Sequence, residues 1–300
     1  MHWGFFDASL LPILSVHSGD QVTFHCVSGE PEDMPADASK VLPELREIHA
    51  RCDPGLGPHI MTGPIWVTGA DPGDTLEVRI LRCSLRQDWG WNIMMPSRGT
   101  LPEDFPQLRR IHIPLDRKAM IAELPWGSSL PLRPFFGVMG VAPPAVRGRI
   151  ASFAPGDHGG NLDNKELVEG TTLYLPVWNE GALFSVGDGH AVQGDGEVCL
   201  TALETALSGT FEVIVRKDLS IHLPLAETPT HYITMGFDPD LDNAAKQALR
   251  EMISLLSRIA GLSPEDAYSL SSLAADLHVT QLVDGNKGIH AMLPKDCLPP

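Results

Sequence analysis

The sequence predicts a mainly β fold, with helices added near the C-terminus. Three observations support this prediction. Glycine and proline number 28 and 26 among 300 residues, and they divide the chain into short segments. Several segments alternate apolar and polar residues with the period of two that is typical of a half-buried strand. Apolar residues at helical spacing become prominent only after residue 240.

Composition and charge exclude several classes of protein. Hydrophobic residues make up 43% and charged residues 20% of the chain, as in ordinary globular proteins. The 22 basic and 38 acidic residues give a net charge of -16, which argues against nucleic-acid binding and against attraction to anionic lipid. No run approaches the roughly 20 apolar residues of a membrane span. We therefore expect neither nucleic-acid nor membrane partners.

The cysteines and the N-terminus indicate a reducing compartment. The five cysteines are widely spaced and form no C-x-x-C motif, so neither a disulfide framework nor a structural zinc set is expected. The N-terminus lacks a basic region followed by an apolar core, which a secretory signal would have. A cytoplasmic location is the resulting expectation.

Two stretches in the first part of the chain share one pattern. Residues 10–27 and 64–81 each contain an apolar strand, a turn with Gly-Asp and a second apolar strand. We predict two similar hairpins, with Gly-Asp serving as turn chemistry. The acidic segment 28–58 between them contains a short predicted helix near 39–50. His59 follows it, held between rigid and flexible residues, and is a candidate ligand or an ordinary structural histidine.

A long loop with aromatic residues is predicted over residues 85–106. Trp89 and Trp91 either line a pocket or pack on the core, which is the commoner fate of tryptophan. Residues 111–123 resemble another hairpin. Residues 134–143 form an apolar strand whose glycines suit close packing against other backbone.

A polar loop is predicted at residues 156–163. Its adjacent glycines, Gly159 and Gly160, expose backbone N–H groups that can bind an anion or a carbonyl oxygen. His158, Asn161 and Asp163 add polar side chains to the same loop. The alternative is an ordinary turn stabilised by its Asn and Asp side chains.

The stretch that organises the whole interpretation is 182–197. Its apolar start suits a buried strand, and on such a strand Asp188 and His190 point to one face. Asp195 and Glu197 repeat this two-residue spacing, and the intervening glycines allow a turn or bulge that brings both pairs together. Carboxylates converging with an imidazole suit a divalent metal. The alternative is a polar hairpin whose acidic groups satisfy the turn.

The C-terminal part changes from strands to helices. Strands are expected at 171–177, 198–207 and 210–215. A helix over 242–260 is ended by Gly261, and a second runs from Pro264 to about Leu277, before a short strand near 281–285. No linker separates the regions, so we predict a single domain over 1–300, β-rich over 1–235 and with a helical addition and C-terminal strand over 240–300.

Several segments, taken in order, resemble the acetamidase/formamidase family. They cover residues 57–64, 69–74, 159–163, 175–177, 187–197, 271–277 and 283–294. The resemblance implies a jelly-roll or CUB-like β-sandwich with added helices. It also implies a homodimer or higher homo-oligomer, and metal-dependent hydrolysis of small linear amides of the formamide or acetamide type to carboxylate and ammonia. The segment 28–56 is the least family-like part and is expected to alter substrate access.

The carboxylate and imidazole side chains within these family-like segments predict a metal site. We expect Asp163, Asp188 and His190 as ligands, with His59 as a fourth. Zinc suits mixed carboxylate and imidazole ligation and is the expected ion, whereas a carboxylate-rich variant using Asp195 would suit calcium. Two different sites are compatible with the sequence.

Catalytic roles follow from the needs of amide hydrolysis. Glu197 is the expected general base and later proton donor. Asn161 and the N–H groups of Gly159 and Gly160 are expected to stabilise the oxyanion. Three aromatic side chains are expected to contact substrate, namely Trp89, Trp91 and His158.

Two other functions are compatible with the sequence. Cys199 lies two residues after Glu197, so on a strand both would share a face, and a thiolate there could form an acyl-enzyme. A buried structural cysteine is the commoner meaning of such a residue. The other alternative is a non-catalytic sandwich that binds a metal or a small ligand.

Overall fold

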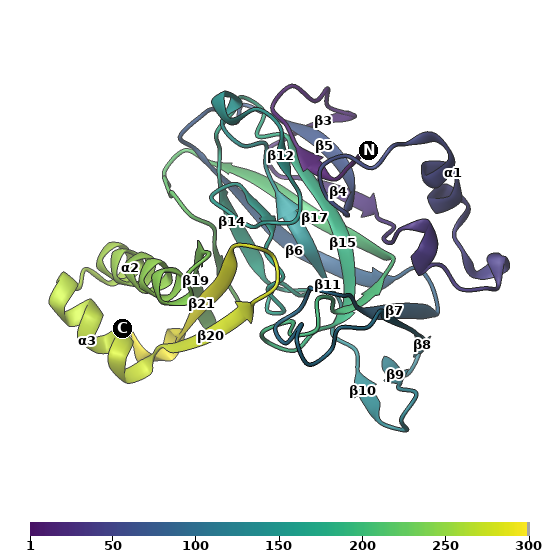
Figure 1. Ribbon diagram of the computed structural model, residues 1–300. Helices are drawn as coiled ribbons and strands as arrows, with labels where there is room; N and C mark the ends of the chain where they lie inside the picture. Colours follow the sequence, from purple (N-terminus) through teal and green to yellow (C-terminus); the bar gives the residue numbers. More distant parts are fainter. Residues whose placement is uncertain (299–300) are drawn as a thin grey trace.

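The computed structural model describes residues 1–298 as two large β-sheets packed face to face, with helices at the two ends of the molecule (Figure 1). Among residues 1–298, pairing between the named strands is antiparallel with one exception, the parallel pair β3 and β5. The predicted β-rich sandwich with additional C-terminal helices is confirmed.

The first sheet contains strands β15 and β16, which carry Asp188, His190 and Glu204. Its main path runs through β1 (His2–Trp3), β5 (Ile60–Thr68), β15 (Phe184–Val192), β16 (Leu203–Thr205), β7 (Trp89–Met94), β8 (Arg109–Asp116), β9 (Ile121–Glu123) and β10 (Ser129–Pro131). Off this path, β3 (Leu14–His17) pairs with β5, and β11 (Phe135–Gly140) pairs with β15 and with β13 (Gly159–Asn161).

The second sheet covers the apolar face of the first. Its order is β20 (Asp276–Gln281), β21 (Lys287–Pro294), β19 (His231–Asp238), β18 (Leu225–Glu227), β14 (Thr172–Pro176), β6 (Thr75–Leu85), β17 (Leu207–Arg216) and β4 (Asp20–His25). A small separate pair joins β2 (Phe5–Phe6) to β12 (Ile150–Ala151).

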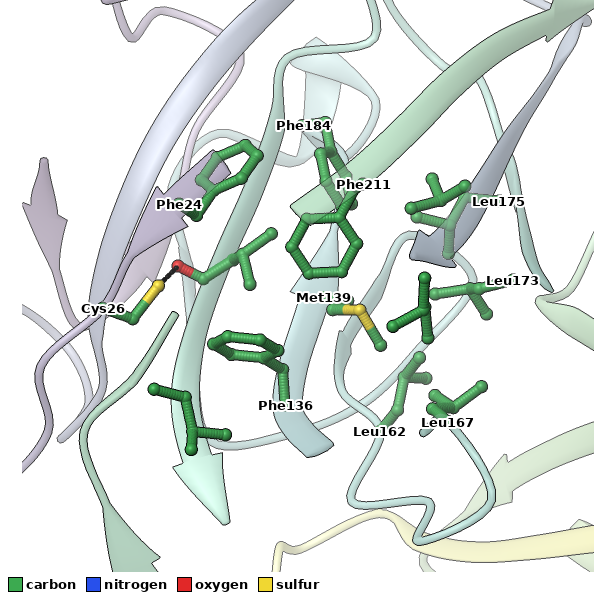
Figure 2. Packing of buried hydrophobic residues seen from close by; sticks show 14 of the residues in the cluster. Phe24, Cys26, Phe136, Met139, Leu162, Leu167, Leu173, Leu175, Phe184 and Phe211 are labelled. Atoms are coloured by element: carbon green, nitrogen blue, oxygen red, sulfur yellow. Dashed lines mark hydrogen bonds between the residues drawn. The ribbon is translucent and has the colours of Figure 1, made fainter. Parts of the chain in front are cut away.

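An aromatic core joins the two sheets (Figure 2). Phe184 of the first sheet meets Phe24 of the second edge to face, with ring centroids 5.9 Å apart. Phe211 packs against Phe24 at 5.6 Å and against Phe136 at 5.6 Å. All four are buried, and such pairs contribute about 0.5–1.5 kcal/mol each beyond the burial of their area.

The two predicted Gly-Asp hairpins are wrong in one respect. The turns are present, because the carboxylates of Asp20 and Asp74 accept hydrogen bonds from the backbone N–H groups of His17 and Asp71. However, β3 and β4 lie in different sheets, and so do β5 and β6. Each Gly-Asp turn is therefore a corner that carries the chain across the sandwich. Local sequence encodes the turn but not the partner of each strand.

The C-terminal helices were largely predicted. Helix α2 (Leu241–Ala260) begins where Asp240 accepts a hydrogen bond from the N–H of Asn243, and it ends at Gly261 in the left-handed conformation. It packs on β19 and β21, and α3 (Pro264–Ala274) follows it. Figure 1 shows α2 and α3 at the end of the molecule opposite α1 (Pro43–Arg51). Among the described helices, none combines the length and apolarity needed to cross a bilayer.

Four predicted boundaries are wrong. The predicted aromatic loop contains strand β7, because Trp89 and Trp91 pair with β8. The strand predicted over 198–207 forms only at its end, as β16, and residues 198–202 are a loop. Leu277 belongs to β20 rather than to the second helix, and the short strand predicted near 281–285 is wrong, because residues 282–286 form the bend between β20 and β21. In each case non-local pairing overrides the local pattern.

Candidate active site

Acidic side chains and two histidines converge at one end of β15. Most of them line a cavity of about 510 Å³. Four of the acids are buried and at most 7% exposed, whereas Asp284 is partly buried. The cluster consists of Asp163, Asp188, Glu197, Glu204, Asp284, His59 and His190.

Adjacent strands and their turns position the cluster. Asp188 and His190 lie on β15, where His190 Nε2 is 3.1 Å from Asp188 Oδ2, as the two-residue spacing predicted. Glu204 on β16 is the cross-strand partner of His190. Glu197 lies in the loop between these strands. Asp163 follows β13, and Asp284 lies between β20 and β21.

The imidazole of His190 has a defined orientation. Its Nε2 is 3.1 Å from Asp188 Oδ2 and 3.2 Å from Glu204 Oε1, while Nδ1 is 2.9 Å from Gln193 Oε1. The Nε2 of Gln193 donates to the backbone oxygen of Asp163 at 2.7 Å, so the Gln193 oxygen must face His190. Because that oxygen only accepts, Nδ1 of His190 carries the hydrogen. Its Nε2 is then directed at the two carboxylates.

Burial and mutual repulsion raise the pKa values of three acids in the cluster. Burial raises the pKa of Glu204 to about 8, with His190 opposing the shift and Asp188 adding to it. Burial and the nearby charges of Asp163 and Asp284 hold the pKa of Glu197 well above its usual range. Burial and Asp163 do the same to the pKa of Asp284. Groups of this kind are typical of functional sites.

Asp188 and His190 stabilise each other in their charged forms. Burial raises the pKa of Asp188, but the charges of His190 and His59 and a hydrogen bond from His190 outweigh it, so the net pKa lies below the usual range. Burial lowers the pKa of His190, but Glu204 and Asp188 raise it well above normal. A positive charge is thus strongly stabilised between these two carboxylates.

The donor set fits a divalent cation. Two groups place one ligand atom per residue within 4.8 Å of the others, namely Asp188 with His190 and Glu204, and Asp163 with His190 and Glu197. Three carboxylate oxygens in the cluster have no hydrogen-bond partner within residues 1–298. Buried carboxylates without partners are costly unless a cation or proton compensates them. The atoms are Asp163 Oδ1, Glu197 Oε2 and Asp284 Oδ2.

The backbone at the cluster is strained. Asp163, Asp188 and Glu197 have φ angles of 45°, 57° and 45°, in the left-handed region. Such conformations cost about 1–3 kcal/mol each and persist where the surrounding structure enforces them, often at functional sites. All three carboxylates lie around His190, Asp163 and Glu197 in one group of candidate ligands and Asp188 in the other.

Gly137 on β11 provides the space for the cluster. A Cβ at this position would lie 2.4 Å from Asp163 Oδ1 and 2.6 Å from Asp188 Oδ2. The carbonyl oxygen of Gly137 also accepts hydrogen bonds from the N–H groups of Leu162 and Asp163. Gly137 therefore lets the backbone of β11 lie directly against the acidic side chains.

The predicted oxyanion group is only partly brought together. Asn161 lines the cavity, and its Nδ2 donates to the backbone oxygen of Phe153. The N–H of Gly159 is already bonded to the oxygen of Gly156, and Gly160 lies within the β13 and β11 pairing. Neither glycine is among the cavity-lining residues, so their placement does not support the expected role.

Two of the expected substrate contacts lie away from the cavity. Trp91 lines it, but Trp89 packs behind, with its indole N–H donating to the backbone oxygen of Lys40. His158 is buried against Phe6, with ring centroids 5.0 Å apart, and burial lowers its pKa to about 4. Core packing is thus the observed environment of Trp89 and His158.

Asp195 belongs to a different cluster from Glu197. Its carboxylate is 2.7 Å from Lys165 Nζ and 3.2 Å from His278 Nδ1. Together with His278 and His290 it forms a separate group of candidate ligands. The turn at 194–197 therefore separates the predicted pair instead of joining it.

Cys199 does not share a face with Glu197. Both residues lie in the loop after β15, where no strand alternation applies. The Cys199 sulfur accepts a hydrogen bond from Asn92 Nδ2 at 3.1 Å. Cys199 is not among the residues that line the acidic cavity. The geometry on which the thiolate alternative depended is absent.

Sequence reasoning missed four residues of the site. Glu204 and Asp284 were given no role, although Glu204 lies in a segment predicted as a strand and Asp284 in a family-like motif. Gln193 and Gly137 support the cluster without contributing charge. A signal was present for Glu204, because a strand following 182–197 through a glycine turn can place an acidic residue opposite His190.

The comparisons with known proteins agree with this fold. A model described as the Acetamidase/Formamidase family matches residues 9–147 and 145–298. A formamidase from Methylophilus methylotrophus is 28% identical over 299 residues, covering 75% of this chain and 73% of the relative. The crystal structure of an acetamidase from Bacillus halodurans is 36% identical, with a TM-score of 0.85 and coverage of 97% and 94% of the two chains.

A second solved structure gives the same result. A protein described as a predicted acetamidase/formamidase from Thermoanaerobacter tengcongensis is 30% identical, with a TM-score of 0.87 and coverage of 98% of this chain and 93% of that chain. The family model accounts for nearly the whole sequence. The chain belongs to the acetamidase/formamidase family of amide hydrolases.

Proposed function

We propose that this protein hydrolyses a linear amide to a carboxylate and ammonia at the acidic end of the cavity, in a metal-dependent reaction. The observation that carries this proposal is the convergence of four buried acids, with the partly buried Asp284, around His190 beside a cavity of about 510 Å³. Family membership supports the amide chemistry. The arrangement of donors supports the metal dependence.

The ligands we propose are Asp188, His190 and Glu204. The Nε2 of His190 lies 3.1–3.2 Å from an oxygen of each carboxylate. Ligands bonded at about 2.0–2.1 Å to one tetrahedral ion are separated by similar distances. His59 Nε2 is 3.7 Å from Asp188 Oδ2 and is the proposed fourth ligand. Two imidazoles with two carboxylates favour zinc over calcium.

We assign Asp163 a supporting role, because it cannot bind the same ion together with Nδ1 of His190. Its Oδ1 is 3.8 Å from Nδ1 of His190, but that nitrogen carries the hydrogen bonded to Gln193. Burial raises the pKa of Asp163, and burial together with the charge of Asp163 raises the pKa of Asp284. A proton held by one of these two acids would limit the repulsion around Glu197.

Glu197 is the proposed general base and acid. A bound divalent ion would supply Lewis acidity, which acidifies water and polarises a carbonyl oxygen. Glu197 lines the cavity, and burial together with Asp163 and Asp284 raises its pKa. A carboxylate tuned upward in this way can take a proton from the attacking water and deliver it to the leaving nitrogen. The leaving group then departs as ammonia.

Asn161 is the proposed donor to the developing oxyanion. One hydrogen of its side-chain amide is bonded to the oxygen of Phe153 at 3.1 Å. The second hydrogen remains for the carbonyl oxygen of a substrate in the cavity that Asn161 lines. Its buried Oδ1 has no protein partner in the described chain and can accept from the substrate amide N–H.

Ammonia release from formamide and acetamide tests the function. We expect turnover that is lost on treatment with a chelator and restored by zinc. Calcium restoring it instead would change the identity of the ion. Turnover that survives chelation would contradict the metal proposal, and if alkylation of the thiols then abolished it, Cys199 would return as the nucleophile. Metal and amide binding without turnover would indicate the non-catalytic alternative.

Two further expectations stay predictions. A homodimer or higher homo-oligomer can be tested by sedimentation of the purified chain. Localisation of the tagged protein tests the cytoplasmic expectation.

A further inference from the structure

We propose that the natural substrate is a neutral amide with an apolar acyl group of about the size of a phenylacetyl group. This inference rests on the proposed function and extends it to the substrate class. The four non-hydrogen atoms of acetamide need about 120 Å³ at the roughly 30 Å³ that liquid water occupies per molecule. The cavity offers about 510 Å³, in the range typical of much larger ligands.

The chemistry of the cavity changes from its floor to its mouth. The floor is formed by the buried carboxylates, with Glu204 and Glu197 only 6% and 7% exposed. On the solvent side the apolar side chains of Leu56, Met95 and Phe153 line the cavity and are 55%, 40% and 43% exposed. The charged side chains of Glu30 and Arg98 are exposed there as well. A substrate that fills this space therefore places its amide at the floor and an apolar group toward the mouth.

Three different segments supply the apolar mouth. Leu56 precedes β5, Met95 directly follows β7 and Phe153 follows β12. Large apolar side chains are unfavourable in water. A group of them around a cavity therefore indicates a surface that an apolar ligand covers. Between mouth and floor, the buried rings and branches of Trp91 and Ile60 continue the apolar wall.

The charges favour a neutral acyl group over an anionic one. Of the two arginines at the cavity, Arg110 is already paired with Asp33 at 2.8 Å. Glu30 also lines the cavity, so its negative charge offsets the positive charge of Arg98 in the sum over the lining residues. With carboxylates at the floor as well, the cavity has no excess of positive charge to attract a substrate carboxylate. An uncharged aryl or branched alkyl group fits these walls.

The first test compares kcat/KM for ammonia release from 2-phenylacetamide and acetamide by the metal-loaded full chain. We expect 2-phenylacetamide to be favoured by at least about ten-fold, since each well-placed methylene in an apolar pocket can contribute about 10-fold or more. An equal or higher value for acetamide would overturn the proposal. A preference for succinamate, an anionic amide, would also overturn it.

Variants at the mouth locate the contact. Phe153→Ala and Met95→Ala should each lower kcat/KM for 2-phenylacetamide more than for acetamide, and chiefly by raising KM. Leu273→Ala is the matched control, because Leu273 is an apolar residue on α3 that is 86% exposed and does not line the cavity. Equal losses on both amides in the mouth variants would contradict a role in acyl-group selection.

Calorimetric binding separates this proposal from the proposed function. If no amide were hydrolysed, the proposed function would fail, but 2-phenylacetamide should still bind more tightly than acetamide and more weakly to Phe153→Ala. Absence of that preference in binding would overturn the substrate class by itself. Turnover of acetamide without any preference for the larger amide would leave the hydrolase and reject only the acyl group.

Discussion

The side-chain amide of Gln193 fixes which nitrogen of His190 faces the carboxylates. Its oxygen lies 2.9 Å from His190 Nδ1, while its nitrogen donates to the backbone oxygen of Asp163. The backbone oxygen can only accept, so the amide has one orientation and the imidazole one tautomer. An uncharged residue three positions after His190 thereby presents Nε2 to Asp188 and Glu204.

Replacement of this amide should weaken metal binding. In Gln193→Met the volume is nearly kept, but the hydrogen bond to His190 is lost. We expect zinc affinity, measured by calorimetric titration of the chelator-treated chain, to fall by about 10–100-fold, as for other partners of ligating histidines. Gln87→Met is the control, since Gln87 is also buried but bonds to Trp89. Unchanged affinity in Gln193→Met would refute the orienting role.

A methyl group at Gly137 should disrupt the cluster. The added Cβ would meet Asp163 Oδ1 at 2.4 Å and Asp188 Oδ2 at 2.6 Å. We expect Gly137→Ala to lose most amidase activity and about 1–3 kcal/mol of the free energy of unfolding, the usual cost of overpacking. Denaturant titration and ammonia release measure the two effects. Gly194→Ala is the control, because a Cβ there meets nothing within 4 Å. A fully active Gly137→Ala would contradict the tight fit.

Glu197 and Asp195 should behave differently despite their two-residue spacing. Glu197→Gln keeps the shape but cannot accept a proton, so we expect kcat to fall by about 10²–10⁴-fold with zinc content unchanged. Asp195→Asn should lose little activity, because Asp195 pairs with Lys165 and His278 away from the cavity floor. Elemental analysis and ammonia release measure both variants. A comparable loss in Asp195→Asn would restore the sequence-based hypothesis that Asp195 is a ligand.

The sequence predicted those parts of the site that depend on one strand. Asp188 and His190 lie two residues apart on β15, so their closeness is a local feature of one strand. Glu204 joins them only because β15 turns back to pair with β16, and that pairing is set by contacts distant in sequence. Asp284 enters from a turn nearly a hundred residues after His190. Residues of this kind carry no local periodicity that marks them.

The same limit applies to the fold. Helix α2 was predicted closely, because its apolar spacing and Gly261 are both local signals. The Gly-Asp turns at 19–20 and 73–74 were also recognised, yet the strands they join belong to different sheets. A turn residue restricts φ and ψ at the corner, whereas the choice between a hairpin and a crossing depends on the opposing sheet.

A buried histidine should make the protein sensitive to mild acid. Burial lowers the pKa of His158 to about 4, from an ordinary value of 6.5. Between these two pH values the unfolded chain binds more protons at this position than the folded chain does. The free energy of unfolding therefore falls as the pH falls below 6.5, and the contribution of His158 is fully lost near pH 4.

Replacing His158 with a side chain that does not titrate should weaken the pH dependence of the free energy of unfolding. A shift of one pKa unit corresponds to about 1.4 kcal/mol, so between pH 6.5 and pH 5 His158 should account for about 2 kcal/mol of lost stability. Denaturant titrations of chelator-treated protein at pH 7.5 and pH 5 should show a loss smaller by this amount in His158→Leu than in the wild type. His222→Leu, at an exposed position, is the control. An equal loss in His158→Leu and the wild type would mean that water or a shift of the surrounding chain solvates the protonated ring, contrary to its packing against Phe6.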